Sequence, residues 1–274
     1  MTRLSELGEL GLLAELERRG LIVGVEHDAA ELGGIVLTQD ALVEGVHFLL
    51  DRLTWRDLGW RAAAVNLSDL AASGAAPLGL LVTLAAPPDT AAADVIELYE
   101  GMRETGVPVV GGDTASAAAV TLSVTAAGRS ERVPGRAGAR PGDILVVSGP
   151  LGAAGAAFRA GGYVRPPVRL DEGRELAATA HALLDVSDGL AVDAGHLAHR
   201  SGVRCVVDLD RVPLAPGAAI EDLGFGEDYE LLAAVADPGR FTAIGRVEEG
   251  EGVELLLDGR PAELPGWEHF RAHK

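Results

Sequence analysis

The sequence predicts a mixed α/β (α+β) protein with two domains. Its length of 274 residues exceeds that of one typical domain. In both halves, short apolar runs bounded by glycine alternate with longer Ala- and Leu-rich stretches, the pattern of strands interleaved with helices. Between the halves, residues 129–142 are rich in Arg, Gly and Pro, as a linker is. We expect an N-terminal domain over residues 1–135 and a C-terminal α/β domain over residues 136–274.

The first half begins with a helix over residues 4–19, because leucines recur there at helical spacing until Gly20 ends the run. Short apolar runs flanked by glycine then predict strands over residues 21–25 and 34–38. Two Ala-rich segments predict helices, and further apolar or alternating segments predict strands. The expected helices cover residues 57–72 and 91–105, and the expected strands cover residues 78–86, 107–110 and 120–127.

The second half repeats this alternation. Strands are expected over residues 144–147, 204–209, 230–235, 242–247 and 253–257, and helices over residues 174–183 and 188–199. A Gly/Ala-rich turn over residues 149–155 opens another helix. The N-terminus of that helix is one candidate phosphate site, although a plain strand-to-helix turn is favoured. The turn is not a Walker A loop, since no Gly-Lys-Ser/Thr follows it, and no protein-kinase catalytic loop is present.

Composition narrows the class of function. The net charge of −18 argues against nucleic-acid binding, which needs a basic surface. No uninterrupted apolar run reaches membrane-spanning length, and the N-terminus lacks the features of a signal peptide. The single cysteine, Cys205, lies in an apolar run and is expected to be a buried thiol. We therefore expect a cytoplasmic protein without a membrane partner.

Six aspartates are the candidate metal-binding residues. Asp28, Asp40, Asp69, Asp113, Asp185 and Asp188 each follow or close a short apolar run. One such aspartate is usually a turn residue or a helix cap. Six of them on loops after buried runs would repel one another if they converged, and would need cations. Hard oxygen ligands suit Mg²⁺, and several Mg²⁺ ions suit a polyphosphate. Gly111 and Gly112 allow a bulky anion to approach the backbone before Asp113.

Six segments carry a resemblance to a known family. They read LVEGVHF (42–48), AVNLSDLAA (64–72), GGDT (111–114), DVSDGL (185–190), GEDYEL (226–231) and GWEHF (266–270). The chain resembles the thiamine-monophosphate kinases, which belong to the superfamily of aminoimidazole ribonucleotide synthetase and selenophosphate synthetase. The resemblance implies a two-domain fold, a homodimer paired through the N-terminal sheets, and direct transfer of the γ-phosphate of ATP to thiamine monophosphate. No phosphoenzyme is implied, and no nucleophilic triad stands out.

The resemblance also implies a set of site residues. The metal ligands would be Asp28, Thr38, Gln39, Asp40, Asp69, Asp113, Asp185 and Asp188, with Asp40, Asp113 and Asp188 as catalytic residues. ATP would contact Gly112, Asp113, Arg129 and Ser187, where the Arg129 guanidinium could fork onto phosphate oxygens. Thiamine monophosphate would meet His47, Glu227 and Trp267. From the residues alone, His47 and Trp267 are more often packing residues than ligands.

This chain departs from the family pattern at three points, one of which is that it is short for the family overall. Glu26 and His27 precede Asp28 where the family usually has Gly-Asp. The segment between Pro213 and Gly226 is short, and Phe225 stands where a glycine is common, which could reshape the substrate side of the pocket. Two alternatives therefore stay open: another ATP-dependent enzyme of the superfamily with a different substrate, or a nucleotide-binding protein that has lost catalysis.

Overall fold

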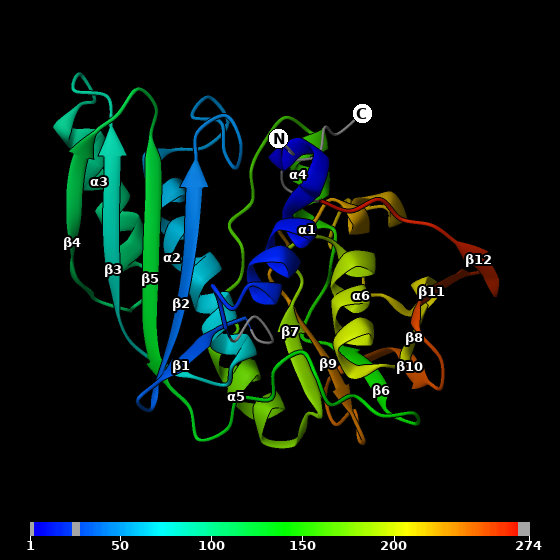
Figure 1. Cartoon of the computed structure of the whole chain (residues 1–274). Helices are drawn as coiled ribbons and strands as arrows, with labels where there is room; N and C mark the ends of the chain where they lie inside the picture. The colour runs from blue at the N-terminus through cyan, green and yellow to red at the C-terminus, as the bar shows by residue number, and fades with distance from the viewer. Residues whose placement is uncertain (1–2, 24–27, 268–274) are drawn as a thin grey trace.

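Two β-sheets stand side by side in the protein, each with helices against it (Figure 1). The structure is a computed structural model and describes residues 3–23 and 28–267. The first sheet ends at residue 129 and the second begins at residue 144, so the predicted linker lies between them. Among the described residues, no helix is long and apolar enough to cross a membrane.

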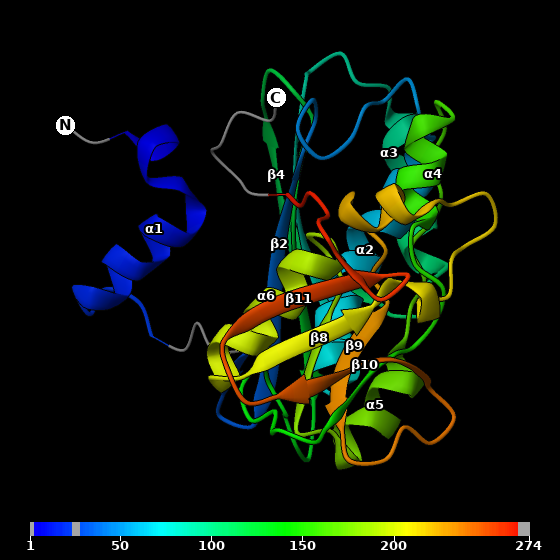
Figure 2. The same cartoon turned by 90° about the vertical axis from the view of Figure 1, so that its right-hand side faces the viewer.

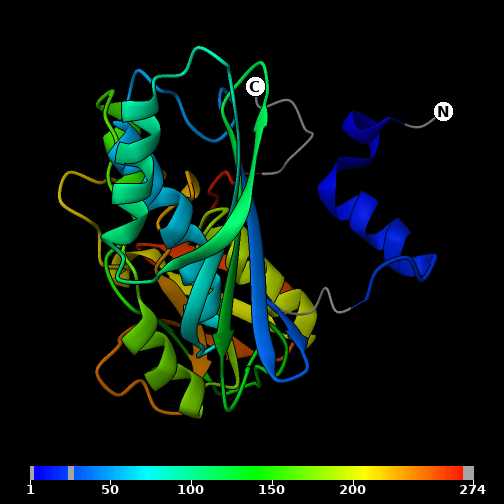
Figure 3. The same cartoon turned by 90° about the vertical axis from the view of Figure 1, so that its left-hand side faces the viewer.

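The N-terminal sheet has five strands in the order β1-β2-β5-β3-β4. They are β1 (Ala30–Leu32), β2 (Ile35–Val43), β3 (Ala76–Ala86), β4 (Val109–Ser116) and β5 (Thr121–Arg129). Helices α2 (Trp55–Ala72) and α3 (Ala92–Arg103) cover one face of this sheet, whereas α1 (Leu4–Arg18) lies on the other side (Figures 2 and 3). The core forms where α2 packs on β2, β3 and β5.

The C-terminal sheet has seven strands in the order β12-β11-β8-β10-β6-β9-β7. They are β6 (Ile144–Val147), β7 (Ala182–Asp185), β8 (Arg204–Asp208), β9 (Leu231–Val235), β10 (Thr242–Glu248), β11 (Gly252–Leu257) and β12 (Arg260–Ala262). Its helices are α4 (Ala153–Arg159), α5 (Leu170–Thr179) and α6 (Leu190–Ser201), with short 3₁₀ turns at Leu209–Arg211 and Ile220–Gly224. Cys205 is buried in this core, as expected.

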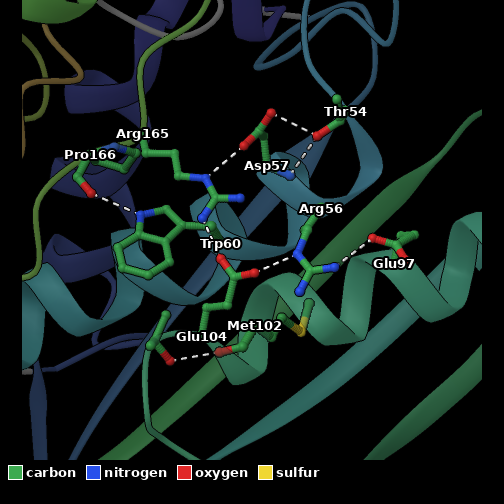
Figure 4. Close-up of polar contacts among 10 residues, drawn as sticks. Thr54, Arg56, Asp57, Trp60, Glu97, Met102, Glu104, Arg165 and Pro166 are labelled. Carbon is green, nitrogen blue, oxygen red and sulfur yellow. Dashed lines mark hydrogen bonds and ion pairs between the residues drawn. The ribbon is translucent and has the colours of Figure 1, made fainter.

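Helix α2 joins the two halves. Its first part packs under the N-terminal sheet, while Ala71 and Ala72 at its end pack with residues of β6, β9 and α5. The segment before α5 is clamped onto the same helix: Trp60 Nε1 donates to the Pro166 carbonyl at 2.9 Å, and Arg165 pairs with Asp57 at 2.6 Å (Figure 4). Residues on α2 are thereby fixed relative to both sheets.

Several predicted elements need correction. Residues 21–23 form no strand, and the rest of that predicted strand lies outside the described residues. Strand β4 runs to Ser116 rather than ending at residue 110, so Asp113 lies within a strand. Asp40 likewise lies within β2, and Asp69 lies in α2. The helix predicted over residues 174–183 is instead α5 followed by β7, since a short buried apolar run does not distinguish helix from strand by periodicity.

Candidate active site

A cavity of about 1140 Å³ is lined by both halves of the chain. It gathers most of the site residues that the sequence predicts. Those residues are Asp28, Gln39, Asp40, His47, Asp69, Asp185, Ser187, Asp188, Glu227 and Trp267. They come from the segment before β1, from β2 and the turn after it, from α2, from β7 and the loop after it, and from the loops at residues 224–229 and 265–267. Segments far apart in the sequence therefore converge on one site.

One end of the cavity is acidic. Carboxylate oxygens of Asp28, Asp69 and Asp185 lie within 4.8 Å of one another. The three side chains come from the segment before β1, from α2 and from the end of β7. Three carboxylates at this separation form an all-oxygen donor set of the kind that hard divalent cations such as Mg²⁺ bind. The donor set therefore fits the metal that the sequence implies.

The electrostatics of this end favour a bound cation. Burial, followed by the charges of Asp28 and Asp188, raises the pKa of Asp40 to about 6. Burial and the charge of Asp28 raise the pKa of Asp185 to about 7. Burial and the charge of Asp40 raise the pKa of Asp69 well above its ordinary value. Each shift reports a carboxylate whose charge is poorly compensated, and a cation would compensate it.

Two neighbouring side chains partly compensate the cluster. Arg136, in the segment between the sheets, pairs with Asp28 through Nε at 2.6 Å and Nη2 at 2.5 Å. The Ser68 hydroxyl donates to Asp185 Oδ2 at 2.5 Å and so links α2 to β7.

A second group of potential ligands adjoins the first. Single ligand atoms of Asp188, Asp193 and His196 lie within 4.8 Å of one another. Asp193 Oδ2 also accepts a hydrogen bond from the Asp188 backbone N–H at 3.0 Å. Asp193 lies in the first turn of α6 and fixes the loop that carries Ser187 and Asp188.

A strained backbone segment lines the cavity beside the loop that carries Ser187 and Asp188. Glu227 and Tyr229 have positive φ angles of 60° and 51°, which is unusual for residues other than glycine. Their backbone N–H groups donate to the carbonyls of Ser187 and Val186 at 2.8 and 2.9 Å. Strain of this kind concentrates at functional sites, where the surrounding structure holds it in place. Here it directs Glu227 toward the cavity.

Known proteins resemble this chain over nearly its whole length. Residues 26–130 match the family described as AIR synthase related protein, N-terminal domain. The thiamine-monophosphate kinase of Aquifex aeolicus is 35% identical over 310 residues, covering 98% of this chain and 100% of that relative. The thiamine-monophosphate kinase of Mycobacterium tuberculosis is 35% identical over 312 residues, covering 97% and 93%. A solved structure of AaThiL complexed with AMPPCP and TMP matches with a TM-score of 0.89 at 35% identity, covering 98% of this chain and 99% of that one.

The chain belongs to the thiamine-monophosphate kinase family. The predicted family and the predicted mixed α/β fold are thereby confirmed. The alignment with the Aquifex aeolicus kinase spans 310 positions, more than the 274 residues of this chain. That relative therefore has insertions that this chain lacks.

Thr38 lies beside the cavity, and hydrogen bonds hold the cavity residues His47 and Trp267 in place. The Thr38 side chain is buried, and its hydroxyl donates to the Asn66 carbonyl at 3.1 Å. His47 Nδ1 accepts from the Val43 N–H at 2.9 Å, which fixes the ring after β2. The Trp267 N–H donates to the Asp188 carbonyl at 3.0 Å and ties the chain end to the acidic side. Glu26 and His27, the departure before Asp28, lie outside the described residues.

Three predicted residues lie away from this cavity within one chain. Gly112 and Asp113 are exposed on β4, and Arg129 ends β5. Asp40, Val124, Val82 and Gly112 follow one another across four neighbouring strands, so Asp40 and Gly112 lie about 14 Å apart. Asp113 pairs in register with the exposed Thr83, on the face away from α2. In a single chain, Asp113 does not meet the other aspartates.

The Gly/Ala-rich turn also has a different role from the phosphate site that was considered. The Asp228 carboxylate accepts hydrogen bonds from the N–H groups of Gly152 at 2.7 Å and Ala154 at 3.4 Å. The protein's own side chain thus occupies the start of α4, and the favoured interpretation of a plain strand-to-helix turn holds.

Sequence reasoning missed several groups in the cavity wall. Arg61, Arg136, Tyr163 and Tyr229 all line the cavity. Arg61 was detectable in principle, because Arg61, Val65 and Asp69 recur at helical spacing and so share one face of the predicted helix. Arg136 and Tyr163 lie in irregular segments, where spacing carries no such information.

Proposed function

We propose that this chain transfers the γ-phosphate of ATP to thiamine monophosphate, forming thiamine diphosphate and ADP. The observation that carries the proposal is the cavity, which joins the carboxylates expected to hold metal with the residues expected to meet the acceptor. Membership of the family and the likeness to a structure complexed with AMPPCP and TMP support the same reaction. The single buried cysteine supports a cytoplasmic location.

Different residues of the cavity would bind the metal and orient the acceptor. Asp28, Asp69 and Asp185 would hold Mg²⁺, which neutralises phosphate charge when bound. His47, Glu227 and Trp267 would orient the acceptor. An oxygen of the acceptor phosphate attacks the γ-phosphorus, and the bond from that phosphorus to the β–γ bridging oxygen breaks as ADP leaves.

We further propose that the active enzyme is a homodimer paired through the N-terminal sheets. The sheet face away from α2 exposes large apolar side chains: Leu78, Leu81 and Val110 are 49%, 50% and 65% exposed. Asp113 lies on that same face. Pairing of two such faces would bury the apolar side chains and bring Asp113 of one chain toward the second chain. This explains why a residue expected to bind metal lies apart from the others in one chain.

The reaction is tested with purified protein, Mg²⁺-ATP and thiamine monophosphate, by measuring ADP and thiamine diphosphate. Magnesium-dependent diphosphate formation, abolished by Asp185→Asn and by Asp113→Ala, is the expected result. Asp171→Asn, on the exposed side of α5, is the matched control and should retain activity. ATP binding without diphosphate formation would contradict the proposal and direct attention to another acceptor or to a protein without catalysis.

The dimer is tested by mixing the two inactive variants under conditions that exchange subunits. If each site takes Asp185 from one chain and Asp113 from the other, mixed dimers contain one intact site, and random pairing restores about a quarter of the wild-type activity. Mixed dimers that form but show no activity would refute a shared site.

A further inference from the structure

Arg61 lines the cavity at a distance from the acidic end, and its hydrogen-bonding capacity is only partly used. The Arg61 side chain is 5% exposed and pairs with Glu227. Its Nε atom is buried without a hydrogen-bond partner among the described residues. The hydroxyl of Tyr163, whose ring lies 6.0 Å from the Arg61 guanidinium carbon, is also buried and lacks a partner there. Buried polar atoms are normally paired, so the polar groups of Arg61 and Tyr163, which both line the cavity, are incompletely satisfied by the described residues.

Helix α2 sets the distance between this wall and the acidic end. Arg61, Val65 and Asp69 all line the cavity at intervals of four residues. Eight residues of helix separate Arg61 from Asp69 by about 12 Å. An extended acceptor made of an ethyl phosphate, a thiazolium ring and a pyrimidine ring spans such a separation. With its phosphate at the acidic end, its pyrimidine reaches the wall of Arg61 and Glu227.

The pair has the chemistry to recognise an aminopyrimidine edge. Its carboxylate is a hydrogen-bond acceptor, and the adjacent guanidinium carries five N–H donors, more than the bond to Glu227 uses. The 4-aminopyrimidine of thiamine monophosphate presents the complement, an amino donor next to a ring nitrogen acceptor. Burial raises the pKa of Glu227, and the Arg61 charge opposes this rise. The ion pair thus favours the carboxylate form that accepts from an amino group.

We propose that Arg61 is a specificity-determining residue, which together with Glu227 reads the donor–acceptor edge of the acceptor's aminopyrimidine ring. This inference rests on the proposed function, because it assumes that thiamine monophosphate is the acceptor. Glu227 takes the amino hydrogen, and the Arg61 guanidinium donates to the ring nitrogen. The Tyr163 hydroxyl supports the same wall.

The test compares two acceptors that differ at this edge. Oxythiamine monophosphate has an oxo group in place of the amino group and a protonated ring nitrogen, so its donor and acceptor are exchanged. Binding of each acceptor to the full chain is measured by calorimetry with Mg²⁺ and a non-hydrolysable ATP analogue. We expect the wild type to bind the amino form at least about 30-fold more tightly, from two hydrogen bonds of about 1 kcal/mol each.

The variants assign this discrimination to Arg61. In Arg61→Met, the ratio of the two dissociation constants should fall to about fivefold, because one hydrogen bond of about 1 kcal/mol, to Glu227, remains. If Arg61→Met does not fold because Glu227 loses its charged partner, Arg61→Lys serves in its place, since lysine keeps a positive charge beside Glu227. Arg61→Lys should also lower the ratio of the two dissociation constants, because lysine lacks the planar fork of donors. Arg56→Met is the matched control: Arg56 lies on the same helix but pairs with Glu97 and Glu104 at the surface (Figure 4), and its ratio should match the wild type.

The outcomes separate this inference from the proposed function. Folded Arg61→Met and Arg61→Lys proteins that keep the wild-type ratio would overturn the inference, even if the wild type makes thiamine diphosphate. A wild type that does not discriminate between the two acceptors overturns it as well. A wild type that neither binds thiamine monophosphate nor forms the diphosphate overturns both proposals.

Discussion

The stability of the metal-free protein should depend on pH through Asp185. This carboxyl group is buried at the acidic end, and its pKa is raised from 3.8 to about 7 by burial and by the Asp28 charge. At pH 4 Asp185 is largely protonated in the folded protein. As the pH rises toward 7, the unfolded chain releases a proton that the folded chain keeps, so the free energy of unfolding falls. Above pH 7 the loss is complete.

The size of the effect follows from the same shift. A change from 3.8 to about 7, at about 1.36 kcal/mol per pKa unit, corresponds to about 4 kcal/mol. Asp185→Asn removes this titration and also relieves the charge repulsion from Asp185 that helps to raise the pKa of Asp69 and of Asp193. Without metal, the variant should therefore be about as stable as the wild type near pH 4 and more stable by about 4 kcal/mol at pH 8.

Urea unfolding with a chelator, at several pH values between 4 and 8, measures this difference. Subtracting the free energies of unfolding of the two proteins cancels the contribution of groups that Asp185 does not influence, such as His196. Burial lowers the pKa of His196 to about 4, so its contribution to stability changes with pH in the opposite direction. Saturating Mg²⁺ should stabilise the wild type far more than the variant. Asp171→Asn should follow the wild type at every pH. A difference between wild type and Asp185→Asn that does not change with pH would refute the reasoning.

Two further predictions concern stability and reactivity. Gly59→Ala should lower the free energy of unfolding, measured by urea titration, by about 3 kcal/mol. The reason is that a Cβ at Gly59 would lie 1.8 Å from the Leu98 carbonyl oxygen, between α2 and α3. An unchanged urea midpoint would contradict this close packing. Cys205 is buried, and burial raises the pKa of its thiol to about 12. Iodoacetamide at pH 8 should therefore label Cys205 only after unfolding, as followed by mass spectrometry. Rapid labelling of the native protein would contradict this prediction.

The sequence predicted most of the elements because their patterns are local. Helix α2 was expected over residues 57–72 and is found at Trp55–Ala72, since its Ala-rich run and its end before Gly74 are visible in the sequence. Strand β4 was predicted too short because Gly111 and Gly112 look like a turn. In the structure these glycines lie inside the strand, where a Cβ at Gly112 would meet the Val82 carbonyl oxygen at 1.8 Å. Close packing between strands requires glycine here.

The candidate site was predictable only in part, for a related reason. The aspartates lie in short motifs, so their residue types could be recognised without knowledge of the fold. The convergence of Asp28, Asp69 and Asp185 depends on contacts between distant segments. The ion pair of Arg61 and Glu227 joins residues 166 positions apart, and no local pattern predicts such a pair. The placement of Asp113 on the opposite sheet face depends on strand register, which the sequence did not fix.

The position of α2 links the two ends of the site physically. Asp69 belongs to the acidic end and Arg61 to the opposite wall, and both lie on one helix that contacts both sheets. A helix does not stretch, so their separation is fixed more firmly than it would be by loops. The Ser68–Asp185 hydrogen bond and the Trp60–Pro166 contact hold this helix against the C-terminal half at the level of each end. In the proposed binding mode, an acceptor that lacks the bridge between its phosphate and its pyrimidine would not engage both ends at once, and α2 would select for the length of the acceptor as well as for its edge.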